Sequence, residues 1–192
     1  LTPADRPAII TGFGRLLKRY RKIYIPGPDV GTNDADMKRF AIENGLNNAV
    51  SKPADMGGNR IDELGGAANG VVVAFKTLVK QLPRLKNLPQ FRHLTLPSPE
   101  DQTLLIQGFG AVGAHVARIF HEYDPHTPPV IKGISDVHGF LMNENGLPWQ
   151  QLFDLWKQFG EVTRRYFHDT ILHGTQNTDP RTIYSSCADN LL

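Results

Sequence analysis

The chain has 192 residues, of which 40% are hydrophobic and 21% are charged, and its formal net charge at pH 7 is +2. This composition is typical of an ordered globular protein, with room for one domain or for one domain and part of another. The near-balance of charge argues against a nucleic-acid-binding protein, and no stretch reaches the roughly 18 apolar residues that a membrane span requires.

The single cysteine, Cys187, excludes an internal disulfide framework and favours a reducing compartment, so we expect a cytoplasmic protein. The one basic run, over residues 15–22, places its charges on one helical face, which is typical of a solvated helix. Because the chain begins at Leu1 and not at methionine, we expect a processed or partial chain. We assign no metal site, no nucleic-acid partner and no membrane contact.

The first half of the chain predicts helices separated by loops. In chain order the expected elements are a helix over 2–20 that opens on Thr2, a strand over 23–25, a helix over 33–44, a glycine-rich loop over 51–66 and an apolar helix over 70–82. Asn33 is a typical N-cap, and Gly45 is a typical stop for the helix that it begins. Residues 83–99 hold four prolines and are expected to form an exposed excursion.

The second half alternates short apolar strands with amphipathic helices. The expected elements are a strand over 104–107, a helix over 111–123, a strand over 130–135 and a helix over 148–159. Strands that alternate with a crossover helix predict an α/β fold with a parallel, Rossmann-type sheet.

A glycine-rich turn joins the first of these strands to its helix, which is the context that a dinucleotide-binding G-x-G-x-x-G pattern requires. We expect Gly108 to allow the tight turn, Gly110 to let the backbone approach a pyrophosphate, and Gly113 to let helix and strand pack closely. The free amides and the positive dipole end of the helix would face the anion. The expected cofactor-binding residues of the turn are Gly108, Phe109, Gly110, Ala111, Val112 and Gly113. The alternative is a packing turn in some other α/β protein.

An acidic residue follows the second strand, as this interpretation requires. Asp136 lies 23 residues after Gly113, where a carboxylate accepts hydrogen bonds from the adenosine ribose. The same charge would repel a 2′-phosphate, which favours NAD over NADP as the cofactor. Lys132 and His138 lie close in sequence and could offset part of that repulsion.

A second constellation is Pro-Gly-Pro-Asp-Val-Gly-Thr-Asn over residues 26–33. The prolines fix the backbone just before Asp29, whose carboxylate could move protons to and from a substrate amine. The alternative from local sequence is a turn-forming aspartate with Asn33 as a helix cap.

Three segments in this order resemble the Glu/Leu/Phe/Val amino-acid dehydrogenase family, and glutamate dehydrogenase in particular. They are the segment that ends at Asn33, then Lys52-Pro53 with Gly57-Gly58, and then the run 106–113 with Ser135-Asp136. Gly139 and residues 143–147 also look like the short hairpin that follows the second strand in the family. The resemblance covers most of the chain from about residue 20, with 83–103 as an insertion, and 189–192 look like the start of a further strand.

The resemblance implies an NAD(P)-dependent enzyme that oxidatively deaminates an α-amino acid to a 2-oxo acid, as a homo-oligomer in its full-length form. It implies a proton-transfer role for Asp29 as the catalytic residue of this chain. Residues 1–66 would be the tail of the substrate domain with its connecting loop, and 67–192 an incomplete dinucleotide-binding domain. The substrate-binding lysines of the family have no match here, and Ala67 stands where relatives carry a threonine.

The chain is therefore expected to carry mainly the cofactor-binding part and not to turn over amino acids alone. The alternative is a non-catalytic nucleotide-binding or assembly module derived from the same family. A Rossmann oxidoreductase of another class would leave the segment around Asp29 unexplained.

Overall fold

The computed structural model describes residues 4–59, 61–95, 98, 101–173, 179 and 181–186. The chain forms two compact units, Leu1–Leu64 and Gly65–Leu192, and each is described by itself. The expectations for Thr2, for Cys187 and for a strand at 189–192 lie outside the described residues. In the part of the chain that the structure describes, no helix is long and apolar enough to cross a membrane.

The first unit is helical. It contains α1 (Arg6–Leu17) with a 3₁₀ turn at Lys18–Tyr20, α2 (Asp34–Asn44), 3₁₀ turns at Leu46–Asn48 and Ala54–Met56, and α3 (Ile61–Leu64). The strand predicted over 23–25 is wrong, because none of the described residues pairs with it as a strand and the prolines that follow cannot donate to a ladder. The core of this unit packs Leu17 of α1 against Met37, Phe40 and Ala41 of α2.

The start of α2 confirms the helix cap predicted at Asn33. The Asn33 side chain accepts from the Asp36 amide, the Asp36 carboxylate accepts from the Asn33 amide, and Gly45 ends the helix. Arg6 of α1 forms an ion pair with Asp36 and also donates to the carbonyl of Gly31 at 2.5 Å. One guanidinium therefore joins α1, the cap of α2 and the turn before it.

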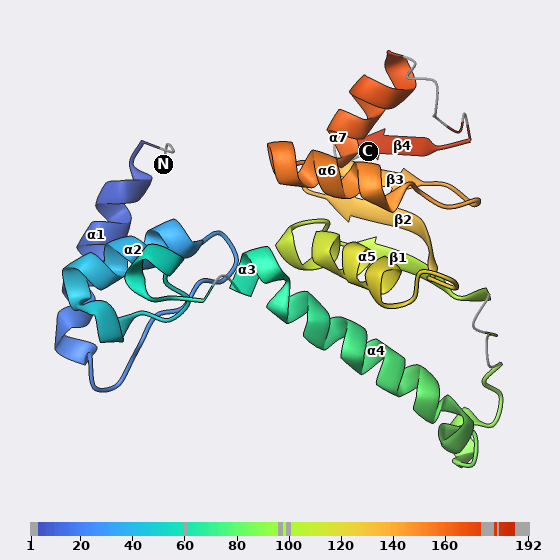
Figure 1. The fold of residues 1–192 in the computed structure, drawn as a ribbon, viewed down its shortest axis with the longest axis horizontal. Helices are drawn as coiled ribbons and strands as arrows, with labels where there is room; N and C mark the ends of the chain where they lie inside the picture. Colours follow the sequence, from blue (N-terminus) through green and yellow to red (C-terminus); the bar gives the residue numbers. More distant parts are fainter. Residues whose placement is uncertain are drawn as a thin grey trace. The chain divides into compact units, whose positions relative to one another are not determined.

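The second unit contains the sheet (Figure 1). Its elements are α4 (Gly66–Leu85), a 3₁₀ turn at Pro89–Phe91, β1 (Thr103–Gln107), α5 (Ala111–Tyr123), β2 (Val130–Asp136), β3 (Gly139–Met142), α6 (Trp149–Phe159), α7 (Thr163–Tyr166) with a π-helical continuation over Phe167–Leu172, and β4 (Ile183–Ser186). The described strands lie in the order β1-β2-β3-β4. The expected strands and helices from residue 104 to 159 are thus present within one residue of their predicted ends.

The sheet is mixed, whereas the alternation of elements predicted a parallel one. β1 and β2 pair in parallel, because α5 carries the chain back across the sheet between them. β2 and β3 pair antiparallel, since only residues 137–138 separate them and so short a connection forms a hairpin. β4 pairs antiparallel with β3.

The helices gather on one face of the sheet, as Figure 1 shows for α5 and α6. The main core packs Ala114 and Ala117 of α5 and Leu152 of α6 onto Ile131 and Ile134 of β2. A second cluster holds α4 against α5 through Ala68, Val72, Val116, Ile119 and Phe120. The helix α4 is longer than predicted, because it continues through Pro83 for the last part of a turn. Part of the expected excursion is therefore helical.

Candidate functional site

The turn after β1 has the backbone that its glycines predict. Gly108 has a φ of +86°, a conformation that side-chain-bearing residues rarely adopt. The carbonyl of Ser135 accepts from the amides of Gly108 at 3.0 Å and Phe109 at 2.7 Å. These two bonds fix the turn to the end of β2. Gly110 then caps α5, which begins at Ala111.

Two glycines of this turn have different surroundings. A Cβ on Gly113 would lie 2.3 Å from the carbonyl oxygen of Gly108 and 3.0 Å from the Ile106 side chain. Gly113 is therefore required by the contact between helix and turn. A Cβ on Gly110 would meet no atom within 4 Å, and its φ of −91° is open to any residue. The packing of the described protein does not explain a glycine at position 110, and open space lies in front of its backbone.

The start of α5 lies next to that space, because Gly110 is its N-cap. No side chain caps this helix end, so the amides of Gly110, Ala111 and Val112 lie where a helix of this length attracts anions. Phe109 differs from these residues, because its ring is buried in the main core and its amide is already donated to Ser135. Phe109 anchors the turn, and a direct contact from it to a ligand stays a prediction.

Asp136 ends β2 where the sequence predicted an acidic residue, and its carboxylate binds the protein's own donors. One oxygen accepts from the amides of Val162 at 3.0 Å and Thr163 at 2.9 Å. The other accepts from the Thr163 hydroxyl at 2.6 Å and from the amide of His138 at 2.8 Å. Asp136 thus ties the start of α7 to the end of β2, and its bond to a ribose stays a prediction.

This network sets the charge state of Asp136. Burial raises the pKa of its carboxyl, but the hydrogen bonds from Thr163, Val162 and His138 outweigh that effect, and the pKa lies below the ordinary value of 3.8. A carboxyl with a lowered pKa stabilises the folded state above its unfolded pKa, and this contribution disappears as the pH falls through the folded pKa.

We therefore expect the contribution of Asp136 to unfolding free energy to be complete at neutral pH and to fade below about pH 4. Denaturant unfolding followed by tryptophan fluorescence measures it, because both tryptophans, Trp149 and Trp156, lie in α6 of the same unit. The difference between the wild type and Asp136→Asn should shrink at low pH. A difference that stays constant down to about pH 3 would contradict this assignment.

A group of charged side chains lies directly beside this carboxylate. The Glu161 carboxylate accepts from His138 Nε2 at 2.9 Å, Arg164 at 2.8 Å and Arg165 at 2.9 Å. Lys132, which also follows the motif, pairs instead with Glu144 at 2.9 Å. Sequence reasoning found His138 and Lys132 but missed Glu161. Its partners lie in two separate segments, the turn between β2 and β3 and the helix α7, which come together only in the fold.

Asp29 lies in the first unit on an exposed turn. Its carbonyl accepts from the amide of Thr32 at 2.8 Å, and its carboxylate accepts from the amide of Val30 at 2.7 Å. Gly31 supplies the positive φ that the turn needs, and Arg6 binds its carbonyl. The turn predicted from local sequence is present, and the catalytic role of Asp29 stays a prediction.

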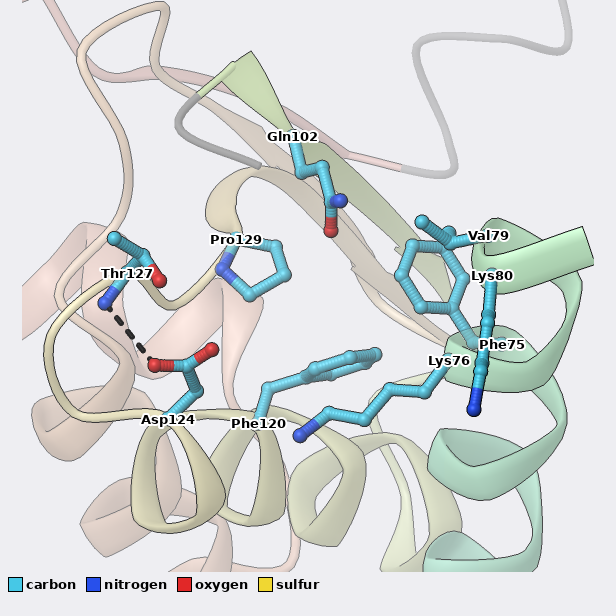
Figure 2. Close-up of a pocket in the computed structure, with 9 residues that line it drawn as sticks. All are labelled: Phe75, Lys76, Val79, Lys80, Gln102, Phe120, Asp124, Thr127 and Pro129. Carbon is cyan, nitrogen blue, oxygen red and sulfur yellow. Dashed lines mark hydrogen bonds between the residues drawn. The ribbon is translucent and has the colours of Figure 1, made fainter. Parts of the chain in front are cut away.

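A cavity of about 270 Å³ lies at the other end of β1 (Figure 2). Phe75, Lys76 and Lys80 of α4 line it together with Phe120, Gln102 before β1, and Asp124, Thr127 and Pro129 before β2. Figure 2 shows that Phe75 and Phe120 form its apolar wall, with ring centres 5.1 Å apart. Ligands of open α/β sheets bind at the carboxyl ends of the strands, so this cavity is not the expected nucleotide site.

Residues 67–188 match a family described as Glutamate/Leucine/Phenylalanine/Valine dehydrogenase. An NAD-specific glutamate dehydrogenase of Staphylococcus aureus is 32% identical over 154 residues, which are 77% of this chain and 33% of that protein. The cryptic catabolic NAD-specific glutamate dehydrogenase of Bacillus subtilis is 29% identical over 154 residues, or 77% of this chain and 32% of that protein. The chain thus spans about a third of the length of these relatives.

Solved structures give the same fold. Glutamate dehydrogenase of Plasmodium falciparum superposes with a TM-score of 0.64 at 16% identity, over 94% of this chain and 36% of that one. A hetero-hexameric glutamate dehydrogenase of Thermus thermophilus superposes with a TM-score of 0.61 at 19% identity, over 84% of this chain and 37% of that one. The α/β fold with its mixed sheet therefore matches part of a glutamate dehydrogenase structure.

Proposed function

Since this chain belongs to the Glu/Leu/Phe/Val dehydrogenase family, we propose that it carries the dinucleotide-binding part of an NAD-dependent amino-acid dehydrogenase. The observation that carries the proposal is the open space at Gly110, in front of the uncapped start of α5. A pyrophosphate fits there, because the site offers amide donors and a positive helix end with no competing side chain. NAD is the proposed cofactor, as the names of the matched relatives state for those proteins.

The proposed contacts divide the turn by role. The amides of Gly110, Ala111 and Val112 would bind the pyrophosphate, while Gly108, Phe109 and Gly113 hold the turn in shape. Asp136 would hold the end of β2 beside the adenosine ribose. We propose that the sheet is the front of a Rossmann-type domain over 67–192 and that residues 1–66 come from the substrate domain.

Asp29 is the proposed proton-transfer residue. NAD, when bound, accepts a hydride from the α-carbon of an amino acid, and a carboxylate near the amine takes up or returns the proton that this oxidation requires. The turn that holds Asp29 leaves its side chain exposed, with the amide of Val30 as a donor to the carboxylate. The substrate class is an α-amino acid, with glutamate as the first one to test in view of the relatives.

Calorimetric titration of the chain with NAD tests the cofactor proposal. We expect saturable binding of NAD and of ADP-ribose, because both carry the pyrophosphate, and weaker binding of AMP, which has a single phosphate. Absence of binding by both NAD and ADP-ribose would overturn the proposal and leave the turn a packing device.

Reduction of NAD in the presence of glutamate, leucine, phenylalanine or valine tests the catalytic part. Because the chain spans a third of its relatives, we expect NAD binding without turnover from the 192 residues alone. Turnover that is lost in Asp29→Asn would instead show a complete site. The second candidate, a non-catalytic binding module, is favoured by Ala67 at the start of α4, where the resemblance called for a threonine.

A further inference from the structure

Glu161 is the centre of an ionic cluster at the carboxyl end of β2. Its side chain is 15% exposed and accepts from the guanidiniums of Arg164 and Arg165 and from His138 Nε2, while Arg164 and Arg165 remain 52% and 44% exposed. The Arg165 guanidinium also lies over the Phe159 ring, 4.5 Å from its centre, in a cation–π contact. The guanidinium groups of Arg164 and Arg165 are therefore partly exposed to solvent, and both pair with the carboxylate of Glu161.

This cluster adjoins the proposed cofactor turn through consecutive bonds. Ser135 receives the amides of the turn, and the next residue, Asp136, receives the amides of Val162 and Thr163. Glu161 directly precedes Val162, and its carboxylate binds His138 two residues after Asp136. The cluster is thus tied to the end of β2, where dinucleotide-binding folds distinguish a ribose hydroxyl from a 2′-phosphate.

Asp136 is poorly placed to make this distinction by its charge alone. Hydrogen bonds from Val162, Thr163 and His138 surround its carboxylate, and these donors partly screen its negative charge from a 2′-phosphate. A phosphate monoester carries about −1.5 to −2 charges at neutral pH and binds guanidinium groups strongly. Arg164 and Arg165 would supply such a site if their charge were not already engaged.

We propose that Glu161 is a specificity-determining residue, which keeps the cofactor choice on NAD by holding Arg164 and Arg165 in ion pairs, beside its contact with His138. This inference rests on the proposed NAD site. Its consequence is that the chain contains a latent 2′-phosphate site, and that loss of one carboxylate exposes it. NAD has no group at that position, so its own affinity depends little on Glu161.

Calorimetric titration of Glu161→Gln and Glu161→Ala with NAD and NADP tests this. We expect NADP to bind about tenfold more tightly than to the wild type, the gain of one or two charge-assisted hydrogen bonds, with NAD changed by less than about threefold. The glutamine variant keeps the size of the side chain, and the alanine variant removes any bridge between the cations. Retained NAD binding in each variant shows that the fold is intact.

Two further variants separate the cluster from a general change in charge. Glu122→Gln removes the same charge from the same unit at the Arg118 pair of α5 and should leave both affinities unchanged. Adding Arg164→Gln and Arg165→Gln to Glu161→Gln should return the NADP affinity to the wild-type level.

The outcomes are distinct for the two proposals. If the wild type binds neither NAD nor ADP-ribose, the cofactor proposal fails. If it binds NAD but the ratio of the two dissociation constants in both Glu161 variants is the same as in the wild type, the inference about Glu161 is wrong. A wild type that already prefers NADP, or an equal gain in Glu122→Gln, would overturn it as well.

Discussion

Replacing Gly110 with valine is expected to abolish NAD binding and to leave the fold unchanged. The Cβ of a larger residue meets no protein atom within 4 Å, and the backbone conformation is open to valine. The valine would occupy the space in front of the α5 amides that the pyrophosphate needs. Loss of two charge-assisted hydrogen bonds corresponds to at least about a hundredfold weaker binding.

Calorimetry with NAD measures the loss, and thermal unfolding measures the fold. Gly70→Val, at a helical glycine of α4 that also has no atom within 4 Å, is the matched control and should bind NAD normally. Gly113→Ala should behave differently, because its Cβ would lie 2.3 Å from the Gly108 carbonyl and must force the turn open. Unchanged NAD affinity in Gly110→Val would remove this turn from the binding site.

Replacing Asp136 with alanine is expected to be the most destabilising single change to the second unit that concerns the site. The carboxylate accepts four hydrogen bonds from Val162, Thr163 and His138. Without it, two amides at the start of α7 lose their acceptor at a partly buried position. We expect a loss of about 2 to 4 kcal/mol in unfolding free energy, since bonds to one charged group are not additive.

Urea unfolding followed by tryptophan fluorescence checks this, with a lower midpoint and an unchanged slope as the expected result. Asp154→Ala is the matched control, because Asp154 is an exposed aspartate of α6, and it should change stability by less than about 0.5 kcal/mol. If the two variants unfold alike, the network at Asp136 contributes little to the stability of this unit.

The parts of the fold that could be predicted from sequence are those encoded by local patterns. The cap at Asn33, the glycine turn, and the strands and helices on either side of it depend on residues that are close in sequence. The strand predicted near residue 24 failed because a strand also needs a partner, which no local pattern supplies. The antiparallel pairing of β2 and β3, which makes the sheet mixed, could have been predicted from the short connection between them.

The site was predictable in position but not in its bonds. Asp136 lies where the motif required an acid, yet its donors at 162 and 163 come from a segment 26 and 27 residues away. The sequence pattern near Phe109 did not show whether this residue contacts a ligand or packs in the core. No sequence motif marked Glu161 as part of the site, because its partners come together only after β2, β3 and α7 have assembled.

The bonds of Arg6 bear on how variants of this protein should be interpreted. Its guanidinium stands 23 residues before Asp29 in the chain, and it binds both Asp36 and the carbonyl of Gly31. A substitution at Arg6 would therefore disturb the Asp29 turn, although Arg6 is not among the proposed ligand contacts. If the proposed dehydrogenase is screened for lost activity as a longer protein, such a variant would look like a defect in chemistry although it arises from the packing of two helices. Restoring the ion pair with a reciprocal exchange, Arg6→Asp with Asp36→Arg, would not rescue it, because an aspartate at position 6 cannot donate to the Gly31 carbonyl.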